Sequence, residues 1–216
     1  MLVSRAVQRV TLIAWSDYLC PWCYNASVRL RRLEDALGQQ LRVEWRSYLL
    51  RPRPGARRDI ERFRAYTASW QRPAAEPDGG VFRPWVGEAR PPSHSIPAHQ
   101  LAKAAARVSD RAFRAMHERL LLAYFFESRD ISDVATQQEL WRELELPETA
   151  FAERDDPAIT KQIVAEHREA QEGGATGVPA VRLAGNDAII VGAHPYELYE
   201  RWVTRILERG LPGAEA

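Results

Sequence analysis

Two cysteines, Cys20 and Cys23, are the residues of this sequence with the clearest chemical potential. They are the only cysteines in the 216 residues, they stand three positions apart, and Pro21 and Trp22 lie between them. Thiols at this spacing can close into a disulfide within one helical turn and reopen, which makes a reversible two-electron site. A structural zinc site needs about four ligands, and the chain holds no second cysteine pair. The pair therefore predicts thiol–disulfide chemistry rather than a metal site or two inert core cysteines.

The residues around the pair predict a strand, a helix and a second strand. The nearly continuous apolar run of residues 10–15 is typical of a buried strand, and it ends just before the cysteines. Apolar residues then recur at helical spacing, at Ala26, Leu30, Leu33 and Leu37, and Gly38 is a plausible end of this helix. Alternating apolar and charged residues over 41–46 indicate the next strand. Such a unit predicts parallel strands with a right-handed crossover.

This placement assigns different roles to the two thiols. Cys20 falls where the strand ends, and Pro21 suits the first helical position because it has no N–H and a fixed φ. The free N–H groups and positive end of the helix would stabilise a thiolate on Cys20. Cys23 precedes Ala26 by three positions and so continues the apolar stripe inward. We therefore expect Cys20 to attack and Cys23 to resolve the mixed disulfide.

The rest of the chain predicts one α/β frame interrupted by helices. Residues 58–172 have a helical pattern, except for a proline-rich stretch over 73–97 that predicts a long ordered loop. Two short apolar runs around a turn at 185–187 predict a hairpin, and an amphipathic helix follows Pro195. We predict a discontinuous α/β domain of residues 1–57 and 173–216, with a helical insertion domain of residues 58–172.

Composition narrows the possible partners and the location. The formal net charge is +1, so no global field attracts nucleic acid or an anionic membrane. No run approaches the roughly 20 apolar residues of a membrane helix. Residues 1–9 lack the continuous apolar core of a signal peptide. These features predict a cytoplasmic protein with no nucleic-acid or membrane partner. The sequence leaves a homodimer open.

Three segments together carry a resemblance to a known family. They are Ser-Asp-Tyr-Leu-Cys-Pro-Trp-Cys-Tyr at 16–24, Thr-Gly-Val-Pro-Ala-Val at 176–181 and Val-Gly-Ala-His-Pro at 191–195. Over nearly the whole chain the sequence resembles the DsbA-like thioredoxin-fold oxidoreductases, specifically their cytoplasmic FrnE-type branch. The resemblance implies an α/β thioredoxin-like fold with a large all-helical insertion. It also implies that Pro179 is a cis-proline facing the cysteines, and that the backbone of Val178 pairs with an extended substrate.

The sequence departs from its relatives at two positions. His194 stands where many relatives have glutamine, and Trp22 is not the histidine of the periplasmic oxidants. Residues between the cysteines influence the reduction potential, which spans roughly −270 to −120 mV across such folds. The direction of electron flow therefore stays open. The expected partners are protein or peptide thiols and disulfides, or a small-molecule thiol, with no bound cofactor.

A related branch supplies the first alternative function. The kappa-class glutathione transferases and 2-hydroxychromene-2-carboxylate isomerases share the inserted fold and carry serine at the position of Cys20. Residues 93–101 resemble the segment that borders their substrate site. This branch implies a transferase, isomerase or reductase that uses a low-molecular-weight thiol as co-substrate. Cys20 favours redox exchange instead. A second alternative is a chaperone-like module that binds peptides in an apolar cleft.

Four more residues are candidates for the site. Asp17, three residues before Cys20, could tune the thiol or relay a proton, but its position favours a helix cap. Trp22 and Tyr24 suit either an apolar rim for a partner peptide or burial against the 73–97 loop. His99 could face the thiols from the insertion, although a surface position or a helix start is the commoner place for such a histidine.

Overall fold

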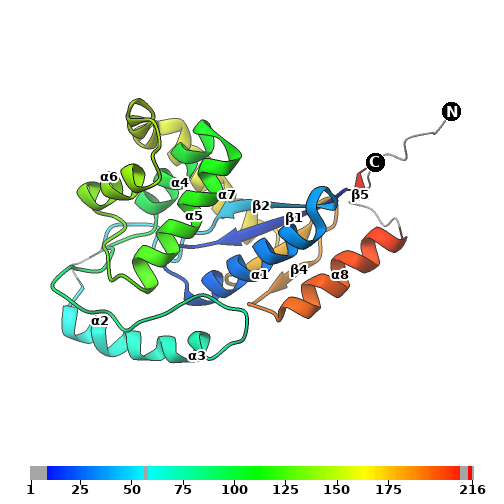
Figure 1. The fold of residues 1–216 in the computed structure, drawn as a ribbon, viewed down its shortest axis with the longest axis horizontal. Helices are drawn as coiled ribbons and strands as arrows, with labels where there is room; N and C mark the ends of the chain where they lie inside the picture. The colour runs from blue at the N-terminus through cyan, green and yellow to red at the C-terminus, as the bar shows by residue number, and fades with distance from the viewer. Residues whose placement is uncertain (1–8, 56–57, 210–213, 216) are drawn as a thin grey trace.

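A mixed sheet forms the centre of the computed structural model, which describes residues 9–55, 58–209 and 214–215 (Figure 1). Its strands are β1 (Arg9–Ser16), β2 (Leu41–Ser47), β3 (Ala180–Leu183), β4 (Ile189–Val191) and β5 (Ala214–Glu215). The order is β2-β1-β3-β4, with β5 paired to the start of β1. β2 runs parallel to β1, and β3 and β4 form an antiparallel hairpin beside it. The predicted crossover unit and hairpin are both confirmed.

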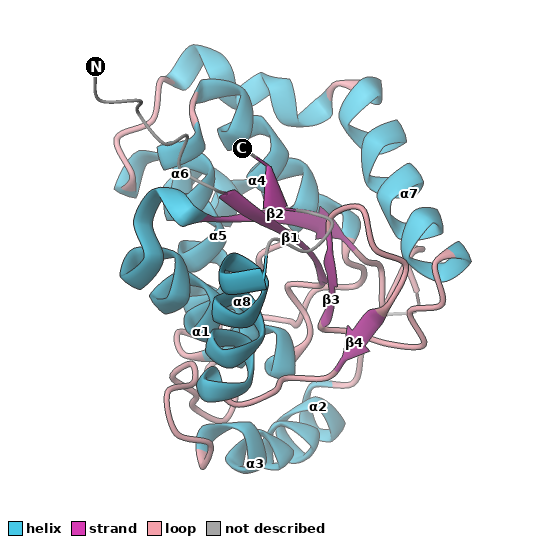
Figure 2. Ribbon diagram, turned by 90° about the vertical axis from the view of Figure 1, so that its right-hand side faces the viewer, coloured by secondary structure: helices cyan, strands magenta, loops and turns pink. Residues whose placement is uncertain are grey.

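Two helices cover one face of the sheet, as Figure 2 shows. They are α1 (Pro21–Leu37) and α8 (Tyr196–Arg209). α1 ends where predicted, because Gly38 takes φ 55°, a left-handed value that favours glycine. Apolar side chains from both helices and the strands fill this layer, among them Leu12, Leu30, Leu33, Tyr199 and Val203. This layer fixes the direction in which α1 presents its N-terminus.

The opposite face is covered by α7 (Pro157–Glu172), which follows the inserted helices in the chain (Figure 2). Ala170 on α7 packs with Ile13, Trp15 and Ala180 of the sheet. The indole N–H of Trp15 donates to the backbone oxygen of Glu166 at 3.1 Å. The boundary predicted between residues 172 and 173 therefore lies beyond a helix that packs on the sheet.

The remaining helices lie between β2 and α7 in the chain and build a second core. They are α2 (Ile60–Thr67), α3 (Gln71–Ala74), α4 (Ile96–Val108), α5 (Asp110–Phe125) and α6 (Val134–Glu143). Three 3-10 turns span Gly38–Gln40, Ala68–Trp70 and Glu148–Asp155. The core is rich in aromatic rings, among them Phe63, Trp70, Trp85, Tyr124 and Phe125. The predicted thioredoxin-like fold with a helical insertion is confirmed.

The proline-rich stretch is an ordered connection between α3 and α4. The helices end at Ala74 and begin at Ile96, slightly inside the predicted limits. Trp85 anchors the connection, because its side chain is 2% exposed and its indole N–H donates to the oxygen of Ala89 at 2.8 Å. Its ring also contacts Phe63, with 5.2 Å between centroids. The loop is thus part of the insertion's core.

Within the described ranges, no helix has both the length and the apolar composition needed to cross a bilayer.

Candidate active site

The two thiols lie at the N-terminus of α1, as the sequence predicts. Cys20 is the N-cap residue, with an extended backbone, and Pro21 opens the helix. The backbone N–H of Cys23 donates to Sγ of Cys20 at 3.2 Å. Both cysteines are free. Sulfur at the cap therefore receives a hydrogen bond from the helix end, which is the contact that stabilises a thiolate there.

A loop before β3 forms the wall opposite Cys20. The peptide bond between Val178 and Pro179 is cis. The backbone oxygen of Val178 accepts a hydrogen bond from Sγ of Cys20 at 3.5 Å. On the other side of the loop, Gly192 N–H donates to the oxygen of Pro179 at 2.8 Å. Cys20 is therefore held between the helix N-terminus and the backbone of Val178.

The second thiol is the more shielded of the pair. The Cys23 residue is 1% exposed, and Cys20 is 5% exposed. Burial, assisted by the hydrogen bond and charge of Cys20, raises the pKa of Cys23 well above its ordinary value. Cys23 therefore keeps its proton at neutral pH. Trp22, between them, is 37% exposed and is the apolar side chain of the motif that a partner can reach.

Asp17 does not cap α1, and the prediction that it does is wrong because Cys20 takes that place. Its carboxylate instead ties the end of β1 to two other segments. Oδ1 accepts from the N–H of Leu19 at 2.7 Å, and Oδ2 accepts from the N–H of Leu50 and the hydroxyl of Ser95, both at 2.6 Å. Burial outweighs these hydrogen bonds and raises the pKa of Asp17 to about 6.

Asp17 should make stability depend on pH. Its pKa rises from 3.8 in the unfolded chain to about 6 on folding, so the folded state binds the proton more tightly. The protonation of Asp17 contributes fully to the free energy of unfolding below pH 3.8, and this contribution is lost as the pH rises through 6. The free energy of unfolding therefore decreases by about 3 kcal/mol over this range. Asp17→Asn is expected to remove this decrease in urea unfolding measured from pH 4 to 7. Asp59 is the exposed N-cap residue of α2 and provides the control. Asp59→Asn should keep the decrease of stability with pH, and an equal slope in both variants would exclude Asp17 as the source.

Tyr24 is buried and does not form a rim for a partner. Its ring packs between Phe82 and Phe125, with centroid distances of 5.4 and 5.7 Å. The loop comes so close that a Cβ on Gly80 would lie 2.4 Å from the Tyr24 ring. Of the two predicted alternatives, Tyr24 follows the one of burial against the 73–97 stretch.

His99 is buried on α4, and its hydrogen bond is to a residue outside the cysteine pair. Its Nε2 lies 3.1 Å from the backbone oxygen of Tyr48, and its ring centroid is 4.9 Å from that of Tyr18. Among the described residues, no hydrogen bond joins His99 to either cysteine. Burial lowers the pKa of His99 to about 3, so the ring is neutral. It supports the segments that flank the site.

Polar residues outside the cysteine motif also hold the site, and their partners could not be predicted from the sequence. Ser95 reaches Asp17 from the start of α4, and Arg29 bonds the loop that follows β4. His117 on α5 bonds the hydroxyl of Tyr18. Arg29 follows Cys23 on α1 and Ser95 lies in the 93–101 segment, but neither position indicates which partner the side chain reaches. Only a regular helix pattern surrounds Arg29 and His117, and that pattern gives no signal for their partners.

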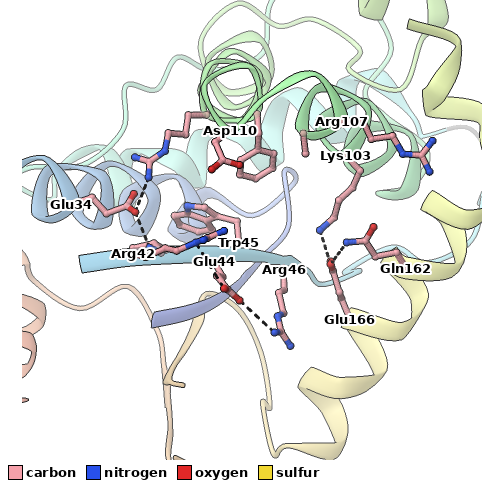
Figure 3. A pocket seen from close by; sticks show the side chains of 14 residues that line it. Glu34, Arg42, Glu44, Trp45, Arg46, Lys103, Arg107, Asp110, Gln162 and Glu166 are labelled. Carbon is pink, nitrogen blue, oxygen red and sulfur yellow. Dashed lines mark hydrogen bonds and ion pairs between the residues drawn. The ribbon is translucent and has the colours of Figure 1, made fainter. Parts of the chain in front are cut away.

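An open groove lies elsewhere, along the edge strand β2 (Figure 3). Its volume is about 460 Å³, and α4, α5 and α7 form its other sides. Two ion pairs bracket it, Lys103 with Glu166 at 2.6 Å and Arg114 with Glu34 at 2.9 Å. Neither cysteine lines this groove. The chemistry of the chain therefore lies apart from this groove.

Comparison with known proteins agrees with the geometry of the cysteine pair. The family model described as the DSBA-like thioredoxin domain matches residues 11–203, most of the chain. The chain belongs to this family. No curated protein matches the sequence. The assignment of this DsbA-like protein therefore rests on the family model, which reaches from β1 to α8 and includes the inserted helices.

Solved structures show the same fold at low sequence identity. A Nitrosomonas europaea protein, provisionally assigned as a protein disulfide isomerase, has a TM-score of 0.77 at 16% identity, covering 93% of this chain and 98% of its own. The cytosolic disulfide reductase DsbM from Pseudomonas aeruginosa scores 0.72 at 22%, covering 92% and 98%. It has also been solved with GSH. A 2-hydroxychromene-2-carboxylate isomerase scores 0.65 at 15%, covering 93% and 97%.

Proposed function

We propose that this DsbA-like protein is a thiol–disulfide oxidoreductase whose redox centre is the Cys20–Cys23 pair. The observation that carries the proposal is the position of Cys20 Sγ, 3.2 Å from the N–H of Cys23 and 3.5 Å from the oxygen of Val178. One contact favours the thiolate. The other is to a backbone group that an extended peptide could pair with once the thiol is ionised.

The reaction balances without a bound cofactor. The Cys20 thiolate attacks one sulfur of a partner disulfide, a bond forms between them, and the other partner sulfur leaves as a thiolate. Cys23 then gives up its proton and attacks Sγ of Cys20, which releases the second partner sulfur as a thiolate. The partner is reduced by two electrons and the pair becomes a disulfide. The reverse sequence oxidises a partner dithiol.

Asp17 is our candidate for the acceptor of the Cys23 proton. Burial and Cys20 raise the pKa of Cys23 most, and the negative charge of Asp17 adds a smaller contribution. Its own pKa of about 6 makes it a base at neutral pH that can hold a proton briefly. Pro21 and Trp22 shape the entrance beside Cys20. Val178 and Pro179 supply the wall against which the partner lies.

The partner is expected to be a peptide or protein disulfide, and a small thiol is the second candidate. The observation that supports the small thiol is that DsbM, which shares the fold, has been solved with GSH. It would use a low-molecular-weight thiol as co-substrate and leave Cys23 dispensable. The cytoplasmic location predicted from the sequence belongs to the same proposal, because DsbM is a cytosolic reductase.

Titration of the pair in glutathione buffers tests the function. We expect one two-electron transition, read as loss of both free thiols by mass spectrometry. Parallel assays with a peptide disulfide and with glutathione disulfide separate the two partner classes. A chaperone-like module would instead suppress aggregation with both cysteines replaced by serine. Failure of the wild-type protein to form the Cys20–Cys23 disulfide at any buffer ratio would exclude the proposal.

A further inference from the structure

A buried imidazole bridges two hydroxyl groups beside the redox motif. His117, on α5, is 4% exposed. Its Nδ1 lies 2.9 Å from the hydroxyl of Tyr18, and its Nε2 lies 2.8 Å from the hydroxyl of Ser27. Tyr18 and Ser27 are themselves 3% and 4% exposed. All three groups are thus satisfied by one another and not by solvent.

The residues that carry the two hydroxyls flank the cysteines in the sequence, one before Cys20 and one after Cys23. Tyr18 is in the loop that leads from β1 to the N-cap Cys20. Ser27 is on α1, one helical turn after Cys23, and residues four apart share a helix face. One side chain of the inserted helices therefore connects the loop that carries Cys20 to the helix turn that carries Cys23.

The bridge has one donor nitrogen and one acceptor nitrogen because the imidazole is neutral. Burial, assisted by the nearby His99, Arg31 and Lys103, lowers the pKa of His117 to about 3. A neutral imidazole has one N–H donor and one bare nitrogen acceptor. One hydroxyl must therefore donate to the ring and the other must accept from it. Neither hydroxyl can turn away without leaving a buried nitrogen unpaired, which is costly.

The surroundings hold the ring in this orientation. Trp45 packs on it at 4.6 Å between centroids, Tyr18 at 5.3 Å and Phe113 at 5.7 Å. The two small cavities that touch His117 measure about 10 and 20 Å³. Each holds a single water at most.

We propose that His117 is a positioning residue of the redox centre, which it holds by joining Tyr18 before Cys20 to Ser27 after Cys23. The inference rests on the proposed oxidoreductase function and adds a residue of the insertion to it. The bridge accompanies free thiols in this structure. Losing it loosens the cap loop against α1 and weakens the contact from the N–H of Cys23 to Sγ of Cys20. The dithiol form is thereby disfavoured relative to the disulfide.

The test measures the equilibrium of the Cys20–Cys23 pair with glutathione in His117→Leu. The dithiol is expected to become less favoured by at least about fivefold, the size of coupling between contacting groups. The pH profile of Cys20 alkylation, resolved by mass spectrometry, is expected to move to higher pH. Tyr18→Phe and Ser27→Ala should shift both readouts in the same direction by less. Each should add little to His117→Leu in a double variant.

Leu120→Ala is the matched control, because Leu120 lies on the same helix, is fully buried and has an apolar side chain that cannot join the hydrogen-bonded bridge. It should lower stability yet leave the glutathione equilibrium within about twofold. A folded His117→Leu with an equilibrium within twofold of wild type would overturn the inference. If that variant does not fold, unchanged equilibria in both Tyr18→Phe and Ser27→Ala would overturn it equally. The proposed function fails separately, when the wild-type pair itself shows no transition.

Discussion

Replacing Cys20 with serine is expected to lower the rate of disulfide exchange by on the order of 10³-fold or more. The hydroxyl does not ionise at neutral pH, so the attacking thiolate is lost even though the cap position and its hydrogen bond can survive. Cys23→Ser should behave differently. Its Cys20 still receives the hydrogen bond at the helix end and still attacks, but the mixed disulfide has no internal thiol to resolve it. That variant is expected to accumulate a covalent adduct with the partner.

Mass spectrometry of each variant after incubation with a peptide disulfide measures both effects. The adduct on Cys23→Ser should equal the added mass of one peptide chain and should disappear with excess reductant. The double variant is the blank, because the sequence has no other cysteine. Full exchange activity in both single variants would contradict the redox mechanism. Full turnover in Cys23→Ser with glutathione as co-substrate would instead favour the small-thiol alternative.

Arg29→Met is expected to lower the free energy of unfolding by about 3 kcal/mol. The Arg29 side chain is 1% exposed, and its guanidinium joins α1 to two separate loops. It donates to the backbone oxygens of Ala193 and His194 at 3.2 and 2.9 Å. It also donates to the oxygen of Pro77 at 2.9 Å and to the carboxylate of Glu76 at 3.1 Å. Methionine fills part of the space but leaves these buried carbonyls without a donor. Removing the buried charge of Arg29 lowers the desolvation cost of folding, which offsets this loss only in part.

Urea unfolding of Arg29→Met against Arg32→Met measures this contribution. Arg32 is on the same helix and pairs with Asp78 at 2.7 Å, but its side chain is 54% exposed. An exposed pair of this kind contributes about 0–1 kcal/mol. The Arg32 variant should therefore remain close to wild type. Equal losses in the two variants would show that the buried contacts of Arg29 contribute no more than a surface charge.

The segment around the cysteines could be predicted because its signals are local. The apolar run of residues 10–15, the helical spacing from Ala26 to Leu37 and the alternation over 41–46 each depend on neighbouring residues. The position of Pro21 and the stop at Gly38 follow from the φ values that these residues allow. The same local rules located the hairpin and the amphipathic helix that follows it.

Predictions failed where a residue's partner lies far along the chain. Asp17 has the spacing of a helix cap, but Leu50 and Ser95 take its carboxylate. α7 has the pattern of another inserted helix, and it covers the sheet because Trp15 and Ala170 meet there. For Tyr24 the sequence left a partner rim and burial both open, and the loop after α3 decided for burial. In each case the outcome depends on which surfaces meet after the chain has crossed over.

By itself, the sequence determined where the two thiols lie, because local geometry is enough to place thiols that bracket Pro21 and Trp22 at a strand-to-helix boundary. Only the tertiary structure decided how that pair is held and how its protons behave. Burial raises the pKa of Asp17 and Cys23, and the bridge from His117 reaches both sides of the motif from a helix of the insertion. The physical reason is that periodicity and capping act between neighbours in sequence, whereas desolvation and long-range hydrogen bonds exist only between segments that folding brings together.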